Sequence, residues 1–418
     1  MTAPTGATHR SAKEIGRTAK GPRPVPEWGK QRTAADLVSA ETVLDSGLRV
    51  VAVRLANVPT VELRLRIPFG ESPTRPHGGS DALHCARSEV LAETLLTGTA
   101  RRDRVAIDTE LALIGGELGT VVDPERLSVS GSSLADGLPT LLDVLADVLT
   151  GATYADGEVA RERERLVERI AVARTQPRVI AREALQQRRY GDHPAVREIP
   201  QASDVAAVAS EEVRAVHLAS VLPRGSVLVL VGDLDPDKVI GDIAAAVGGW
   251  TSDQAASTLA VLPDVTGDDV LLVARPGAVQ SQLRLSSQAL PRTDDRYAAL
   301  QLANLAYGGY FSSRLVENIR EDKGYTYGAH SGFEFTGSTA TLDVDADTAS
   351  EVTAAALMET RYELTRLTVL PPTDEEVDSV RQYAVGSLLI STSSQAGLAS
   401  QLAALAAAGL GVDWLTGH

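Results

Sequence analysis

The chain has 418 residues, 44% of them hydrophobic, and a net charge of −15, a composition typical of a large folded protein. We expect a cytoplasmic protein without membrane contact, because it has no apolar run that spans a bilayer and no secretory signal. The single cysteine, Cys85, excludes an internal disulfide, and the seven histidines lack metal-site spacing. The acidic body disfavours nucleic acid and favours basic partners, although a role in solubility explains the charge equally well.

The first half of the chain reads as a basic arm, one domain and a linker. Residues 1–35 hold seven basic and two acidic side chains without an apolar period, which predicts a disordered arm. Residues 36–250 form the predicted domain and 251–267 a linker. The domain's expected elements are a hairpin at 42–55, a strand at 60–70, helices at 80–97 and 103–115, strands at 117–132, helices at 134–150, 156–188 and 203–220, a strand at 226–234 and a helix at 235–250.

The second half repeats the first. LRLS at 283–286 corresponds to LRLR at 63–66, and EVDSVRQYAVG at 376–386 corresponds to EVARERERLVE at 158–168. The order of elements predicts an α+β fold in which helices pack on a largely antiparallel sheet in each copy. The second domain, 268–418, is expected to lack its last strand, because the counterpart of 226–234 would follow residue 418; we infer a shortened or naturally truncated chain.

Two motifs connect the chain with a known family. The first is the helix that ends in LLTGT at 95–99, and the second is GGYFSSRLVENIREDKGYTYGA at 308–329. Together with the duplication, they resemble the M16 family of zinc peptidases, the inverzincins related to mitochondrial processing peptidase. The resemblance covers most of 40–418 and implies two homologous domains of the M16 type.

The resemblance also shows what the first motif lacks. Catalytic members carry H-x-x-E-H on the first helix, where two histidines and a distal glutamate bind zinc and the intervening glutamate is the general base. Alignment through Gly98 and Thr99 puts Glu89 and Glu93 at the histidine positions, Ala92 at the base, and Glu168 at the distal ligand.

A methyl group cannot accept a proton, so Ala92 alone removes the general base. The carboxylates Glu89, Glu93 and Glu168 are either solvated glutamates on helix faces or a site for a hard cation such as Mg²⁺ or Ca²⁺. His84 and Cys85 lie off the motif's register. We therefore expect no cofactor in this chain and zinc in a partner subunit.

The second motif retains a functional pair of the family. The resemblance implies that Arg320 and Tyr327, seven residues apart, face the active site across a cavity. A guanidinium and a phenol can donate to a substrate carbonyl or to the oxyanion that forms from it. The alternative is that Arg320 pairs with Glu317 or Glu321 on the surface and that Tyr327 is a packed strand residue.

The same motif has a predicted local structure. Phe311, Leu315 and Ile319 are expected to form the buried stripe of a helix capped by Lys323 and Gly324, after which a strand begins.

These observations predict the non-catalytic subunit of a heterodimeric M16 endopeptidase. Its partners would be a catalytic M16 chain with intact H-x-x-E-H and an extended peptide substrate, bound by strand addition. Arg320 and Tyr327 would act in trans in peptide-bond hydrolysis. The alternatives are a scaffold subunit without a catalytic role and an independent enzyme that uses the three carboxylates with another metal. Fold alone does not choose among them.

Overall fold

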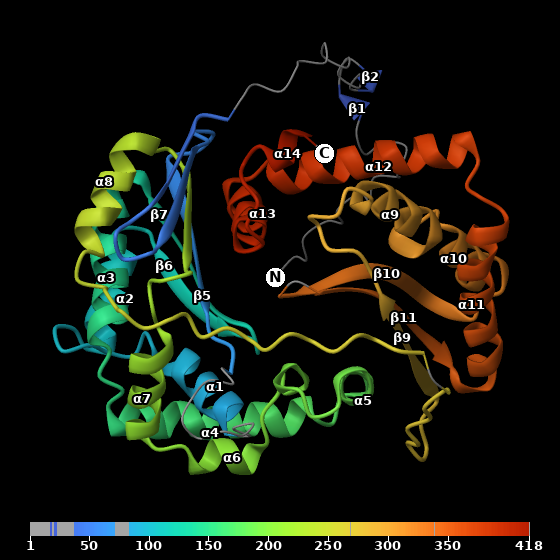
Figure 1. Ribbon diagram of the computed structural model, residues 1–418, viewed down its shortest axis with the longest axis horizontal. Helices are drawn as coiled ribbons and strands as arrows, with labels where there is room; N and C mark the ends of the chain where they lie inside the picture. Colours follow the sequence, from blue (N-terminus) through green and yellow to red (C-terminus); the bar gives the residue numbers. More distant parts are fainter. Residues whose placement is uncertain are drawn as a thin grey trace, which may run out of the picture. The chain divides into compact units, whose positions relative to one another are not determined.

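The structure, a computed structural model, describes residues 17–18, 21–22, 37–71, 83–267, 269–337 and 339–417 (Figure 1). Within the arm predicted to be disordered, β1 (Arg17–Thr18) and β2 (Gly21–Pro22) pair antiparallel, and the rest of that arm lies outside the described residues. The chain from Val38 onward forms a separate unit that contains both copies of the duplicated domain.

The first copy is built on a sheet whose strands follow the order β3-β4-β8-β5-β7-β6. Its described strands are β3 (Ser39–Val43), β4 (Arg49–Arg54), β5 (Thr60–Pro68), β6 (Glu117–Val122), β7 (Arg126–Leu134) and β8 (Val227–Gly232). β4 and β8 pair in parallel, whereas the other neighbours are antiparallel. β5 alternates between buried and half-buried residues, while β8 is buried along its whole length, as its continuous apolar sequence requires.

Helices cover this sheet. They are α1 (His84–Thr94), α2 (Arg104–Leu113), α3 (Leu138–Gly151), α4 (Asp156–Ala173), α5 (Pro177–Tyr190), α6 (Ala202–Ala207), α7 (Ser210–Ser220) and α8 (Pro236–Ala246), with short turns η1 (Ala135–Gly137) and η2 (Pro194–Val196). The helix predicted over 156–188 is two helices, because Pro177 has no N–H to continue α4 and instead begins α5. Residues 251–267 contain neither helix nor strand beyond a bridge between Ser257 and Phe69.

The second copy has a smaller sheet with the order β10-β11-β9. Its described elements are β9 (Gln280–Gln288), α9 (Tyr297–Asn304), η3 (Leu305–Gly309), α10 (Arg314–Val316), η4 (Glu317–Asp322), β10 (Thr326–Thr336), β11 (Thr339–Ala349), η5 (Ser350–Val352), α11 (Thr353–Val369), α12 (Asp374–Thr392), α13 (Gln395–Ala407) and α14 (Trp414–Gly417). The first residues of β5 and β9 are 60 and 280, and their last residues are 68 and 288. Both pairs differ by 220, in agreement with the duplication. The α+β fold is confirmed. Among the described residues, no helix is both long and apolar enough to cross a bilayer.

The two copies exchange one helix each. α5 and α13 are counterparts, since their first residues, Pro177 and Gln395, differ by 218. α5 packs against β9 of the second sheet, whereas α13 packs against β5 and β8 of the first, where Figure 1 shows it. Polar contacts fix both helices. The amide Nε2 of Gln395 donates to the carbonyls of Leu55 (2.6 Å) and Val58 (3.0 Å), and Arg189 of α5 lies 2.6 Å from the Asp343 carboxylate in β11.

Candidate functional site

The helix α1 carries the altered zinc motif and is held firmly in the first copy. It packs against α4, α6, α7 and β6. Ala92, at the position of the general base, is 4% exposed, and its carbonyl accepts a hydrogen bond of 2.5 Å from the Thr120 hydroxyl. Its methyl group is therefore part of the core. Of the three altered motif positions on α1, only Glu89 and Glu93 carry polar side chains.

The residue of α4 that meets this motif is Arg169, not Glu168. The Arg169 guanidinium lies 2.5 Å from the Glu93 carboxylate, whereas Glu168 is exposed. The α4 side chain that reaches Glu93 is therefore that of Arg169, one residue after the Glu168 that motif spacing predicts as the distal ligand. The Glu93 carboxylate is therefore already paired with a cation from this chain.

The helical period of α4 contains the signal that would have identified Arg169. The buried residues of this helix are Val159, Glu162, Leu166 and Ile170. These positions recur every three to four residues, so 169 borders the buried face and 168 points away from it. The spacing of the motif does not contain this distinction, because it counts residues without regard to their direction around the helix.

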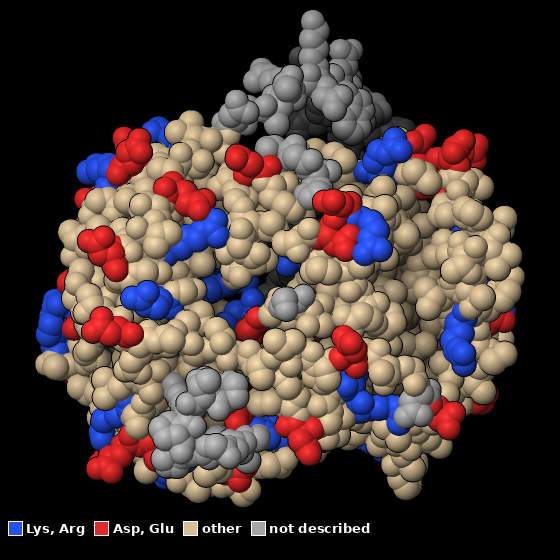
Figure 2. All heavy atoms as spheres, viewed as in Figure 1, with Lys and Arg blue, Asp and Glu red and all other residues tan. Residues whose placement is uncertain are grey.

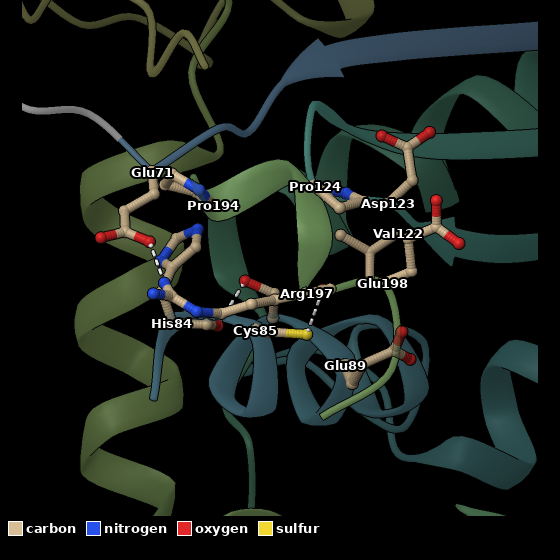
Figure 3. A pocket seen from close by; sticks show the side chains of 11 residues that line it. Glu71, His84, Cys85, Glu89, Val122, Asp123, Pro124, Pro194, Arg197 and Glu198 are labelled. Carbon is tan, nitrogen blue, oxygen red and sulfur yellow. Dashed lines mark hydrogen bonds and ion pairs between the residues drawn. The ribbon is translucent and has the colours of Figure 1, made fainter. Parts of the chain in front are cut away.

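A small cavity of about 20 Å³ lies beside α1. Cys85 and Glu89, one helical turn apart, line it together with Arg197, as Figure 3 shows. The Cys85 thiol donates to the Arg197 carbonyl at 2.9 Å, and burial raises the pKa of this thiol to about 12. Burial, aided by the neighbouring Glu93 carboxylate, raises the pKa of Glu89 to about 7, although Arg169 opposes the shift. The cavity therefore holds a protonated thiol and a carboxyl that titrates near neutrality.

These residues do not fit a zinc ion. Within the described part of the chain, no three His, Cys, Asp or Glu side chains come together as a metal would require. Arg169 would also repel a divalent cation at Glu93. Arg169 bears on the hard-cation alternative as well, because it pairs with Glu93, one of the three carboxylates which that alternative needs.

The raised pKa of Glu89 predicts a pH-dependent stability. The folded state holds this proton more tightly than the unfolded state, so Glu89 lowers stability as the pH rises from about 4.5 to about 7. Glu89→Gln should therefore raise the free energy of unfolding by about 1–3 kcal/mol at pH 8 and leave it nearly unchanged at pH 4. Urea unfolding at the two pH values measures this difference. The control, Glu168→Gln at the exposed neighbouring site, should have an effect below about 0.5 kcal/mol. An equal gain for Glu89→Gln at both pH values would contradict the assignment.

The second motif places Tyr327 in solvent beside a half-buried Arg320. Tyr327 is 94% exposed, and the Arg320 guanidinium lies 5.6 Å from the centre of its ring. The same guanidinium lies 4.8 Å from the centre of the Phe311 ring, and it pairs with Glu321 at 3.2 Å. Two aromatic faces therefore orient the guanidinium, each contact contributing about 0.5–1 kcal/mol at an exposed site.

This geometry agrees with one half of the structural alternative for the motif and not with the other. The surface ion pair of Arg320 with Glu321 is present, but Tyr327 is not a packed strand residue. The buried stripe is confirmed for Leu315 and Ile319, both 0% exposed, and wrong for Phe311, which is 62% exposed in a turn before the helix. Phe311 is thus a contact of Arg320 that the helical pattern assigned to the core.

Buried polar contacts hold the backbone that carries Arg320. Arg314 makes two hydrogen bonds to the Glu376 carboxylate, at 2.7 and 2.8 Å, which lower the pKa of Glu376 to about 2. Asn318 donates to the buried Glu363 carboxylate at 2.7 Å. Arg320 itself lies in η4, a π-helical turn, a rare conformation that occurs frequently at functional sites.

The two motifs are separate in the described structure, where no contact joins Arg320 or Tyr327 to Glu89 or Glu93. On the face drawn in Figure 2, acidic and basic side chains are interspersed, so the charge of −15 is not gathered into one acidic patch on that face. The Arg320 and Tyr327 side chains can donate hydrogen bonds to another molecule, whereas no three metal-ligating side chains come together at the α1 motif among the described residues.

Comparisons with known proteins agree with this two-domain organisation. Residues 88–202 match the family described as insulinase (peptidase family M16), and residues 207–383 match the family described as peptidase M16 inactive domain. A Streptomyces coelicolor protein named as an uncharacterized zinc protease is 28% identical over 69% of this chain, and the match spans 63% of its own length. A Mycobacterium bovis protein with the same kind of name is 26% identical over 77% of this chain and 72% of its own.

Solved structures share the fold. A peptidase M16 inactive domain from Pseudomonas fluorescens has a TM-score of 0.79 at 24% identity, covering 91% of this chain and 90% of its own. A protease from Helicobacter pylori has a TM-score of 0.80 at 16% identity, covering 89% and 90%. The two family matches together span more than two thirds of the sequence. The chain belongs to the M16 peptidase family.

Proposed function

We propose that this chain is the non-catalytic subunit of an M16 peptidase and completes the active site of a zinc-bearing partner. The observation that carries the proposal is the contrast between the two motifs. At the altered zinc motif, Arg169 pairs with Glu93. At the second motif, the hydrogen-bond donors Arg320 and Tyr327 both reach solvent.

The chemistry of the pair supports a role toward a peptide. The partner would supply the metal-bound water for hydrolysis. The Arg320 guanidinium and the Tyr327 hydroxyl would donate hydrogen bonds to the carbonyl oxygen of the substrate, where negative charge develops during the attack. The contacts of Arg320 with Phe311 and Tyr327 restrict the guanidinium before substrate binds, which reduces the cost of ordering it.

A scaffold subunit is the second candidate. It is favoured by the ion pair between Arg320 and Glu321, which gives the guanidinium a structural partner within this chain. The two candidates differ in whether the assembled complex needs the donor pair.

Reconstitution tests the proposed function. The chain should be purified alone and together with an M16 protein of the same organism that retains H-x-x-E-H. Cleavage of an internally quenched peptide library should be low for either protein alone and rise at least about tenfold for the mixture. A partner with full activity in the absence of this chain would refute the proposal, as would an equimolar, tightly bound zinc and full proteolysis in this chain alone.

A further inference from the structure

Arg66 is a charged residue on a central strand of the first sheet. β5 places it opposite Ser128 of β7 and Val227 of β8. Because the strand alternates, Arg66 points away from the buried core residues Leu65 and Ile67. Its side chain is half-buried, yet it forms no ion pair with any residue that the structure describes. Buried charges are normally paired, so an unpaired guanidinium is unusual at this place.

The neighbours of Arg66 do not neutralise its charge. Burial lowers the pKa of Arg66 to about 10, and the positive charge of Arg126 adds to this effect. The carboxylates of Asp123 and Glu125 act in the opposite direction, but both pair with Arg126, at 3.0 and 2.9 Å. The charge of Arg292 lowers the pKa of Arg66 further. Three guanidiniums therefore share two carboxylates, and one positive charge is left uncompensated.

Arg292 is held in place by aromatic residues of the second copy. It follows β9, and its guanidinium carbon lies 3.7 Å from the centre of the Phe335 ring. It also donates to the Tyr297 hydroxyl, and the rings of Tyr297 and Phe335 pack edge to face at 6.0 Å. Neither aromatic group is charged at neutral pH, and no described carboxylate pairs with Arg292. Arg292 is therefore oriented but not neutralised.

The face of the first sheet that carries Arg66 is turned toward the second copy. Arg64, two residues before it on the same face, donates to the Ser400 hydroxyl of α13 at 3.2 Å. The turn between β10 and β11 reaches the same region, because the Gly337 N–H donates to the Glu125 carboxylate at 2.6 Å. The unpaired positive charges therefore come from both copies and lie where the two copies meet.

A cavity of about 430 Å³ lies at this junction, and Arg126 and Phe335 are part of its lining. The charged residues of the lining pair with one another: Arg126 with Asp123 and Glu125, and Arg182 with Glu198 and Glu334. Each carboxylate of the lining therefore already has a cation from this chain. By contrast, Arg66 and Arg292, the neighbours of Arg126 and Phe335, have hydrogen-bond donors without a charged acceptor. The groups that remain available at this junction suit an anion.

We propose that Arg66 and Arg292 bind a carboxylate of a peptide at the junction of the two copies, so that the chain selects peptides with an acidic group. This selectivity rests on the proposed function, because it names the class of substrate that the subunit presents to its partner. A guanidinium donates to both oxygens of a carboxylate, and such charge-assisted hydrogen bonds are strong. The carboxylate belongs either to an Asp or Glu side chain or to the C-terminus of the peptide. The preference is opposite to the one that the net charge of −15 favours, because unpaired donors act locally.

Peptide binding to the full chain, without a partner subunit, tests this selectivity. The probes are short labelled peptides of one sequence in three forms: a central glutamate with an amidated C-terminus, a central glutamine with a free C-terminus, and a central glutamine with an amidated C-terminus. In fluorescence anisotropy, at least one of the first two forms should bind about tenfold or more tightly than the third. The form that does so identifies the source of the carboxylate. Equal binding of all three forms, or no binding of any, would overturn the proposal.

Variants of Arg66 locate the site. Arg66→Gln should abolish the preference for the carboxylate, whereas Arg66→Lys should retain part of it, because a positive charge remains. The control, Arg161→Gln, removes an arginine that is 56% exposed and pairs with Glu158 within α4, and should keep the full preference. An unchanged preference in Arg66→Gln, or an equal loss in the control, would contradict the assignment.

Thermal unfolding separates a binding role of Arg66 from a structural one. Arg66→Gln should raise Tm, because it removes a half-buried charge that has no partner among the described residues. A fall in Tm of about 3 °C or more would show that Arg66 stabilises the fold, and the proposed role would then be wrong.

These measurements are separate from the reconstitution of the peptidase. Peptide binding requires neither zinc nor cleavage, so an inactive mixture would refute the proposed function while the carboxylate preference could still be measured. Conversely, an active complex whose subunit does not distinguish the three peptides would refute the carboxylate site alone.

Discussion

Arg320→Gln and Tyr327→Phe should each lower kcat/KM of the reconstituted peptidase by about 10²–10³-fold, because each removes one donor to the developing oxyanion. Assembly of the complex should not change, since both side chains reach solvent and neither is part of the core. Steady-state kinetics on an internally quenched peptide, with size-exclusion chromatography of the mixture, measures both effects.

Two controls match these variants. Arg381 pairs with Asp378 at 3.2 Å, the same distance as that between Arg320 and Glu321, and Tyr362 is an exposed tyrosine of α11. Arg381→Gln and Tyr362→Phe should leave kcat/KM within about twofold of the wild type. If all four variants retain full activity in an intact complex, Arg320 and Tyr327 have no catalytic role and the scaffold function is correct.

A grafted zinc site should form only after Arg169 is replaced. The triple variant Glu89→His, Ala92→Glu and Glu93→His restores the family motif on α1 but leaves a guanidinium beside the second imidazole. Adding Arg169→Glu supplies a third ligand and removes the repelling cation. We expect this quadruple variant to bind zinc at least about a hundredfold more tightly than the triple variant.

Competition with a chromophoric chelator measures this affinity. The triple variant retains Glu168, so it also tests the register of α4. Tight zinc binding by the triple variant would show that Glu168 reaches the site, contrary to its exposed position. Equal, weak binding by the triple and quadruple variants would show that α1 and α4 are too far apart to share a metal.

Much of the fold could be predicted because local patterns and tertiary structure agree. The alternation of β5 and the apolar run of β8 each indicate a strand and also its depth in the sheet. The duplication was visible in sequence offsets, and β9 begins and ends where β5 predicts. The break before Pro177 was missed because the helical period continues on both sides of it.

The site was harder to predict because it depends on which side chains meet across helices. Motif spacing identified Glu93 but chose Glu168 over Arg169, a difference of one residue that rotates a side chain by about 100° around the helix. Phe311 fits an apolar stripe by spacing alone, yet the turn at this residue directs it to Arg320. Neither contact follows from the composition or periodicity of a single segment.

The exchange of α5 and α13 has a consequence for how this protein holds together. Each repeat places one helix on the sheet of the other, and each also has a hydrophobic core cluster of its own residues. A cut within 251–267 should therefore leave the two repeats associated, because α5 and α13 each still pack on the sheet of the other repeat. We therefore expect the two repeats to unfold in one cooperative transition. Removal of one repeat should expose the surface of the other on which its helix packs.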